Sequence, residues 1–357
     1  MTVEKSSALI LSVIIVSLVG CGKSSEEAEP VTWKIPQEIQ PQELKVEGYT
    51  FATDGNSLMT SLVATEDQLV VSTAEGKIVG LSIDRSQAAP ILRIDEGFGK
   101  NGVIDIRDHI EVEGPVGTQL IEGNGVIFVH TGYDTLRIIE GQMAGKQEFF
   151  PSYQIAVDLS EDGSWGFMNN HRQELLPIYQ EGSRLGRPEP ANNLLADVPP
   201  EFQLYSFLKA AVGSGVVAIA GNSQQKAKDP DRDRERSYTQ LSVFTKAGEP
   251  VFRAGAPRWT KNGLYFNMIT DIEVSGNHVF AYSHNMETIF VFDLKGNLVR
   301  ELESMKLAGI ARGFFRKMDI NSSGELYGII DETNKTGEGR LGMLVLLADF
   351  DPVETDL

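Results

Sequence analysis

A repeated pattern of four short β-strands is the feature that most constrains the fold of this chain. The clearest unit predicts strands at residues 271–274, 278–283, 288–293 and 298–301, separated by turns rich in glycine and asparagine. A second complete unit predicts strands at 61–64, 68–72, 76–84 and 91–94. Four short strands joined by tight turns favour a four-stranded antiparallel sheet, which is the shape of one blade of a β-propeller.

Apolar segments that correspond to the second strand of this unit recur along the chain. Six of them lie at residues 69–71, 126–129, 164–167, 216–219, 279–281 and 326–329. Their uneven spacing, roughly 40 to 60 residues, is typical of blades of constant size joined by loops of different length. We therefore predict an all-β, six-bladed β-propeller over residues 43–357. Seven blades with one degenerate copy and two stacked β-sandwiches are the alternatives.

The last unit predicts only three strands, because a short acidic tail follows Asp349. An unpaired strand edge is an aggregation hazard. The segment 43–49 has strand character but belongs to no complete unit. We therefore expect this N-terminal strand to complete the last blade and to close the ring.

The first 20 residues have the three parts of a secretory signal: a short polar start, an apolar run at 8–19, and small residues at the cleavage site. This run of about a dozen residues is too short to span a bilayer, which needs about 20. The tetrad Leu18-Val19-Gly20-Cys21 resembles the lipobox of bacterial lipoproteins, and Cys21 is the only cysteine in the chain.

The lipobox resemblance implies a signal peptide at 1–20 and a mature chain that begins at Cys21 with thioether-linked lipid and acyl chains such as palmitate. Gly22 follows the cysteine instead of aspartate, which resembles the pattern sent to the outer membrane. Residues 21–42 are then expected to form the lipidated cysteine and a flexible acidic tether. An ordinary signal peptide with an incidental cysteine and a short uncleaved anchor are the alternatives. The strand pattern of the body resembles the six-bladed NHL-repeat and TolB-like propellers of bacterial lipoproteins.

The formal net charge of −18 argues against nucleic acid as a partner, because such binding normally requires a basic face. The dense charged run Lys226–Arg236 alternates acids and bases. It predicts a solvated hairpin loop in the long fourth unit.

A candidate metal site rests on Glu113-Gly114-Pro115, which resembles the start of gluconolactonase-like propellers. In those proteins the glutamate helps to hold a divalent cation at the axial mouth, and a cation such as calcium needs several oxygen ligands. Its candidate companions lie near strand ends in separate units: Asn170, Asn222, Asp271 and Asn285. A Gly-Pro turn between two blades is the simpler interpretation, since the Asn-Asp pairs of that family are absent as contiguous motifs.

Three of the five histidines, His130, His171 and His284, each follow a second-strand segment. This recurrence predicts that they lie at one end of the ring as a possible ligand-binding group, although ordinary polar strand ends explain them too. No pair has zinc-motif spacing, no nucleophile motif is present, and no catalytic residue is assigned. Trp259, Tyr265 and Phe266 favour packing between blades over a surface for a peptide or sugar.

Together these features favour a membrane-anchored, non-catalytic binding or scaffold lipoprotein of the bacterial cell envelope. The lipobox resemblance implies that its lipid places it at the outer membrane. Its expected partner is an envelope protein or a small ligand, and no cofactor is required. The alternative is a metal-dependent, lactonase-like hydrolase with a calcium site on the propeller axis.

Overall fold

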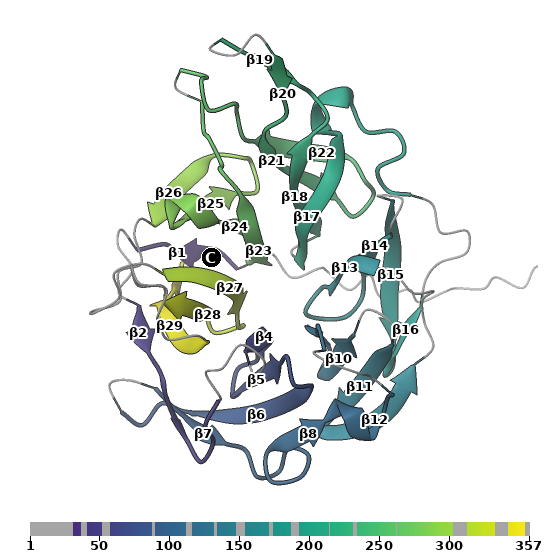
Figure 1. Ribbon diagram of the computed structural model, residues 1–357, viewed down its shortest axis with the longest axis vertical. Helices are drawn as coiled ribbons and strands as arrows, with labels where there is room; N and C mark the ends of the chain where they lie inside the picture. The colour runs from purple at the N-terminus through teal and green to yellow at the C-terminus, as the bar shows by residue number, and fades with distance from the viewer. Residues whose placement is uncertain are drawn as a thin grey trace, which may run out of the picture.

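The computed structural model is a ring of six β-sheets (Figure 1). It describes residues 31–353 except 37–40, 52–57, 88–89, 112–115, 132–133, 148–153, 171–173, 187–192, 214, 231–233, 262, 303–312 and 333–341. The predicted six-bladed, all-β propeller is confirmed. Within the described ranges, no helix has the length and apolar character needed to cross a membrane.

Each of the first three blades is built from strands that follow one another along the chain. Blade 1 contains β4 (Met59–Ala64), β5 (Gln68–Thr73), β6 (Lys77–Asp84) and β7 (Ile91–Ile94). Blade 2 contains β9 (Gln119–Gly123), β10 (Val126–His130), β11 (Thr135–Ile139) and β12 (Gln142–Gln147). Blade 3 contains β13 (Gln154–Leu159), β14 (Gly166–Asn170), β15 (Leu175–Glu181) and β16 (Arg184–Gly186).

The other three blades complete the ring. Blade 4 contains β17 (Leu204–Gly213), β18 (Val216–Ser223), β21 (Thr239–Thr245) and β22 (Pro250–Ala254). Blade 5 contains β23 (Ile269–Ser275), β24 (His278–Ser283), β25 (Thr288–Asp293) and β26 (Leu298–Leu302). Blade 6 contains β27 (Gly313–Ile320), β28 (Glu325–Glu332), β29 (Met343–Asp349) and the N-terminal strand β2 (Gln42–Glu43).

Short elements decorate the blades. β8 (Val103–Asp105) adds to β6, while β19 (Ala227–Asp229) and β20 (Arg234–Arg236) form a separate ribbon. The charged run 226–236 thus forms the predicted hairpin between β18 and β21. Three single-turn 3₁₀ helices are η1 (Ile106–Asp108), η2 (Pro200–Phe202) and η3 (His284–Met286).

The N-terminal segment closes the ring as predicted, but it is divided between two blades. β2 pairs antiparallel with β29, so that Glu43 lies opposite Val345. β3 (Lys45–Glu47) instead runs parallel to β7 of blade 1. Leu44 separates the two strands, and its side chain is buried in the cluster between blades 6 and 1. The single strand expected at 43–49 is therefore two strands that join the first blade to the last.

The predicted boundary between tether and body at residue 43 is about ten residues too late. β1 (Trp33–Lys34) pairs with β30 (Asp351–Pro352), and Trp33 is buried against blade 6 and Phe280 of blade 5. Its indole N–H donates to Ser275 Oγ at 3.1 Å. A large aromatic ring with a hydrogen-bond partner for its one polar atom is stable in a core.

The hydrophobic core consists of six clusters, one between each pair of neighbouring blades. Apolar side chains on both faces of each sheet therefore pack against a neighbouring blade, all the way around the ring. This arrangement explains why second strands such as β10 and β24 are buried at every position. The first strand of each blade lies nearest the axis, and these six strands surround the centre of the ring (Figure 1).

Candidate functional site

The turns between the first and second strands gather at one end of the ring, which we call the hairpin face. A central cavity of about 410 Å³ opens among these turns. Its lining includes Thr65 and Glu66 of the β4–β5 turn, Glu161 of the β13–β14 turn, and Ser275 and Ser322 of two further turns. The opposite end of the ring, where the first strands begin, is called the far face.

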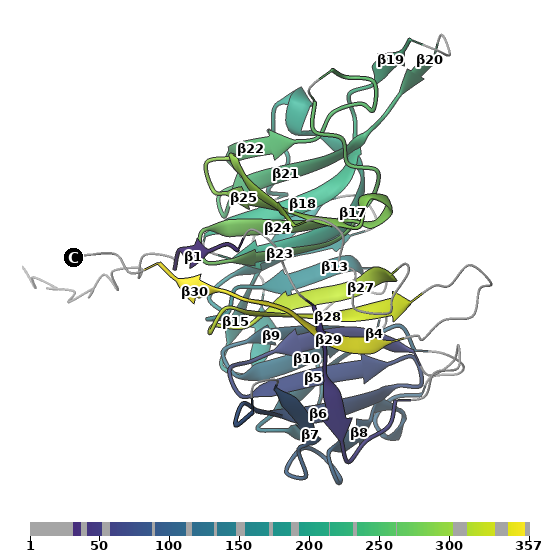
Figure 2. The ribbon, with the colours of Figure 1, turned by 90° about the vertical axis from the view of Figure 1, so that its left-hand side faces the viewer.

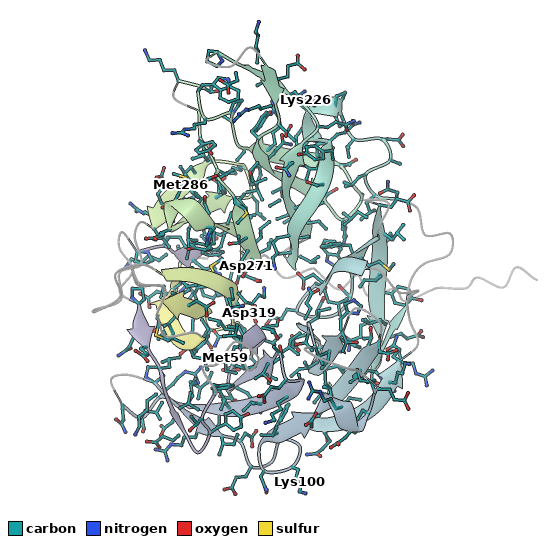
Figure 3. The ribbon with its side chains drawn as sticks, in the orientation of Figure 1. Met59, Lys100, Lys226, Asp271, Met286 and Asp319 are labelled. Atoms are coloured by element: carbon teal, nitrogen blue, oxygen red, sulfur yellow. The ribbon has the colours of Figure 1, made fainter. Side chains whose placement is uncertain are left out.

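Three aspartates on first strands join neighbouring blades near the axis, and Figure 3 shows two of them, Asp271 and Asp319, beside the centre of the ring. Asp158 Oδ2 accepts a hydrogen bond from the Val212 backbone N–H at 2.7 Å, and Asp319 Oδ2 accepts one from the Ala64 backbone N–H at 2.6 Å. Asp271 Oδ2 accepts from the backbone N–H of Met318 in the same way. Each bond links one blade to the next. These carboxylates therefore hold the ring together at its axis.

A shared sequence position explains this recurrence. Asp158, Asp271 and Asp319 each stand five residues before a glycine, and these glycines adopt positive φ values in the first-to-second strand turn: Gly163, Gly276 and Gly324. Glycine adopts this conformation at little steric cost. An aspartate at a fixed distance from such a turn reaches the same height on the axis in each blade. Sequence reasoning noted only Asp271, although this spacing was a signal for all three.

One lysine lies among these carboxylates. Lys317 Nζ is 3.6 Å from Asp271 Oδ1 and forms an ion pair with Glu273. Burial alone would lower the pKa of Lys317, but the nearby carboxylates of Asp271, Glu273 and Asp319 raise it above its usual value. Lys317 therefore stays charged and neutralises part of the acidic cluster.

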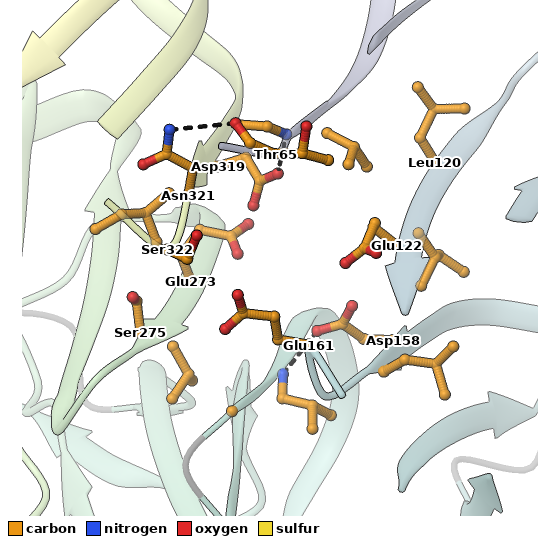
Figure 4. Close-up of a pocket in the computed structure, with 18 of the residues that line it drawn as sticks. Thr65, Leu120, Glu122, Asp158, Glu161, Glu273, Ser275, Asp319, Asn321 and Ser322 are labelled. Carbon is orange, nitrogen blue, oxygen red and sulfur yellow. Dashed lines mark hydrogen bonds between the residues drawn. The ribbon is translucent and has the colours of Figure 1, made fainter. Parts of the chain in front are cut away.

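The negative charges of the remaining carboxylates are only partly neutralised by Lys317 and the backbone N–H groups. Burial raises the pKa of Asp319 to about 7 and that of Asp158 to about 6, although Lys317 and backbone N–H groups oppose the shift. Burial also raises the pKa of Glu122 to about 7 and that of Glu273 well above its ordinary value. Figure 4 shows these carboxylates and Glu161 directed toward the same space. The cavity is thus an acidic chamber that titrates near neutral pH.

The predicted histidine group is only partly described. His130 ends β10 opposite Gln119, where β9 begins, and the His284 backbone N–H donates to the Met268 carbonyl just before β23. Both therefore lie at the far face, away from the acidic cavity. His130 is buried, its Nδ1 is 3.3 Å from Thr135 Oγ1, and burial lowers its pKa. His171 lies outside the described residues. A ligand-binding role for these histidines stays a prediction.

The structure does not bring the predicted metal ligands into one described site. Asp271 lies on the axis and bonds to blade 6, whereas Asn222 on β18 donates its amide to Ser206 Oγ at 2.8 Å and lines a different cavity. Glu113 falls outside the described residues, as do the side chains of Asn170 on β14 and Asn285 in η3. In the described part of the chain, no three His, Cys, Asp or Glu residues are grouped to hold a metal ion. The calcium site stays a prediction, and Cys21 also lies outside the described residues.

The aromatic residues before blade 5 divide between core and surface. Phe266 is fully buried and packs edge-on against Phe290, with ring centres 5.1 Å apart. Trp259 and Tyr265 are half-exposed and line a cavity on the far face. The core assignment holds for one of the three.

Comparison with known proteins gives the fold. No family model matches the chain, and no curated protein matches it. The crystal structure of RRP9 WD40 repeats is similar with a TM-score of 0.51 and 10% identity, covering 88% of this chain and 99% of that one. The structure of U3-55K gives a TM-score of 0.51 and 10% identity, covering 87% and 98%. At this identity the likeness establishes the propeller architecture alone.

Proposed function

We propose that this protein is a lipid-anchored binding lipoprotein of the bacterial cell envelope, held through Cys21 at the outer membrane and presenting its propeller to a partner protein or ligand. The lipobox-like tetrad supports the anchor. The propeller supports the binding role, because it is a rigid ring that carries loops at both ends. The carboxylates near the axis support a non-catalytic role, since Asp158, Asp271 and Asp319 are engaged in backbone hydrogen bonds between blades.

The observation that carries this proposal is the attachment of the N-terminal segment to the hairpin face. The Asn277 backbone N–H, in the β23–β24 turn, donates to the Val31 carbonyl at 2.8 Å, and its side-chain amide donates to Thr32 Oγ1 at 2.8 Å. The same turn lines the central cavity. Nine residues lie between Cys21 and Val31, so the ten Cα-to-Cα steps of a fully extended tether span at most about 36 Å. The acylated protein would therefore turn its acidic cavity toward the membrane.

Anchoring is tested by fractionating cells that express the wild-type chain or Cys21→Ser. We expect the wild-type chain in the membrane fraction, with acyl groups on Cys21 by mass spectrometry, and the variant in the soluble fraction. Equal partition of the two chains would contradict the anchor. Affinity capture with the lipidated protein then identifies the envelope partner.

Orientation is tested separately in vesicles that carry the lipidated protein. A fluorophore on Glu161→Cys, at the hairpin face, should transfer energy to a headgroup acceptor more efficiently than one on Lys261→Cys in the loop before blade 5. Equal transfer, or greater transfer from residue 261, would contradict the proposed orientation.

The lactonase-like alternative is tested by its own requirement for calcium. It predicts that calcium raises the melting temperature and that Glu113→Gln removes this effect. No contact among the described residues favours this alternative over the binding role.

A further inference from the structure

The ribbon of β19 and β20, which we call the charged arm, projects from the far face of blade 4. It interrupts the connection between β18 and β21. Figure 2 shows the arm at the upper right, whereas β1 and β30, beside the start of the tether, lie at the left of the ring. In the proposed orientation the arm therefore points away from the membrane.

A cavity of about 220 Å³, the arm pocket, lies at the base of this arm. Tyr238, Trp259 and Tyr265 line it with rings that are neither buried nor fully exposed. The Tyr265 hydroxyl donates to Asn267 Oδ1 at 3.3 Å, which helps to orient its ring. Half-exposed tyrosine and tryptophan beside arginine are typical of the residues that dominate protein interfaces.

The arm pocket is cationic although the chain as a whole is acidic. Arg236 and Arg258 line it, and no carboxylate is present among its described lining residues. Arg236 Nε is 3.4 Å from the Asp229 carboxylate, whose side chain is 7% exposed, so this guanidinium is held in place. Arg258 is exposed and has no ion pair within the described part of the chain. It therefore remains available to bind an anionic group.

The arm also offers a short sheet edge along β20, where no further described strand is paired. β19 and β20 pair antiparallel with each other, from Ala227 opposite Arg236 to Asp229 opposite Arg234, and with no further strand in the described ranges. Such an edge accepts an extended peptide through main-chain hydrogen bonds. Since Arg236 belongs to β20 and lines the arm pocket, the edge leads directly into the cationic site.

We propose that the arm and its pocket bind an extended acidic peptide segment of a partner protein. The segment adds its backbone to the arm and places carboxylate side chains against Arg236 and Arg258, with its apolar side chains on Trp259 and Tyr265. The open strand edge favours a peptide over an acidic sugar, because a sugar has no backbone to continue the sheet. This inference deepens the proposed binding role by naming the chemistry of the partner.

The test is fluorescence anisotropy with the purified full-length chain and a short labelled peptide of alternating glutamate and valine. We expect saturable binding that weakens as salt rises. Arg258→Gln should weaken it roughly tenfold or more, as expected for loss of one charge-assisted contact. The matched control is Arg253→Gln, which removes an exposed guanidinium from β22 of the same blade, outside the pocket, and should leave binding within about twofold.

Three results would overturn the inference: no binding of the glutamate peptide at millimolar protein, equally tight binding of a lysine-valine peptide, or equal loss in Arg258→Gln and Arg253→Gln. Direct binding of a labelled oligosaccharide of glucuronic acid, without peptide binding, would assign the pocket to sugars instead. A melting temperature equal to that of the wild-type chain shows that each variant is folded. Peptide binding does not require acylation of Cys21, so failure here and failure of the anchoring experiment are distinguishable.

Discussion

Replacing Lys317 with methionine should destabilise the ring more strongly than any other single charge removal at its axis. Lys317 is the only cation among the described residues that line the central cavity, and it faces the carboxylates of Asp271 and Glu273, whose side chains are 3% and 12% exposed. Removing one partner from a buried ion pair typically costs 3–5 kcal/mol, and we take about 3 kcal/mol because the lysine side chain itself is 21% exposed. For a domain of this size that corresponds to a fall in melting temperature of about 5 °C.

The pH dependence of this loss distinguishes electrostatics from packing. Asp319 has a pKa of about 7 in the folded protein, and its pKa should rise further without the lysine. At pH 8 the carboxylates are charged and repel one another, whereas at pH 5.5 they can bind protons and relieve the repulsion. Differential scanning fluorimetry of Lys317→Met should therefore show a deficit at pH 5.5 less than half of that at pH 8. Equal deficits at the two pH values, or a deficit no larger than that of the exposed control Lys45→Met, would refute this reasoning.

Three further changes probe the axis and its turns. The wild-type ring should melt at a higher temperature at pH 5.5 than at pH 8. The pKa values of Asp158 (about 6) and Asp319 (about 7) are raised in the folded protein, so the stability that their protonated forms contribute is lost as the pH rises through these values. A higher melting temperature at pH 8 would contradict this. Asp158→Ala leaves the Val212 N–H without its acceptor and should cost about 1–3 kcal/mol in chemical denaturation, whereas Asp158→Asn keeps an acceptor oxygen and should lose less than half of that. Gly324→Ala, at φ +89° in a crowded turn, should destabilise the protein more than Gly125→Ala, at φ +74° beside open space. Equal losses in the free energy of unfolding would show that the crowding is relieved at no cost.

The architecture could be predicted from the sequence because the strands of most blades follow one another closely along the chain. Each strand of blade 5 appears within two residues of its expected bounds, since the turns and the apolar segments are adjacent in the chain. The closure by an N-terminal strand was also predictable, because the last unit lacks a strand. The burial of Trp33 was not predicted, because its partners lie about 240 residues away or more, at Ser275 and in blade 6. An isolated tryptophan in an acidic segment gives no local signal for such a contact.

The axial site was harder to predict for a related reason. Apart from Glu113 and Asp271, the candidate residues lie at or just after the ends of second strands, and the two histidines whose positions are described lie at the far face. The carboxylates that meet at the axis come instead from first strands, where an aspartate within an apolar run resembles an ordinary strand interruption. Only the common five-residue distance to a turn glycine relates Asp158, Asp271 and Asp319, and that distance acquires meaning once the ring is known.

The two ends of the ring differ in chemistry, and this difference bears on how an anchored propeller would work. The hairpin face combines the acidic cavity with the start of the tether at Val31, while the far face carries the arm pocket with Arg258. Glu273 is already paired with Lys317, and Asp158 and Asp319 already accept backbone hydrogen bonds from neighbouring blades. Protonation of these carboxylates near neutral pH should therefore alter the cohesion of the blades. No histidine or carboxylate is present among the described residues that line the arm pocket. Peptide binding at the arm and the stability of the ring should therefore respond to pH independently. The affinity for a peptide lacking histidine should differ by no more than about twofold between pH 5.5 and pH 8, while the melting temperature shifts.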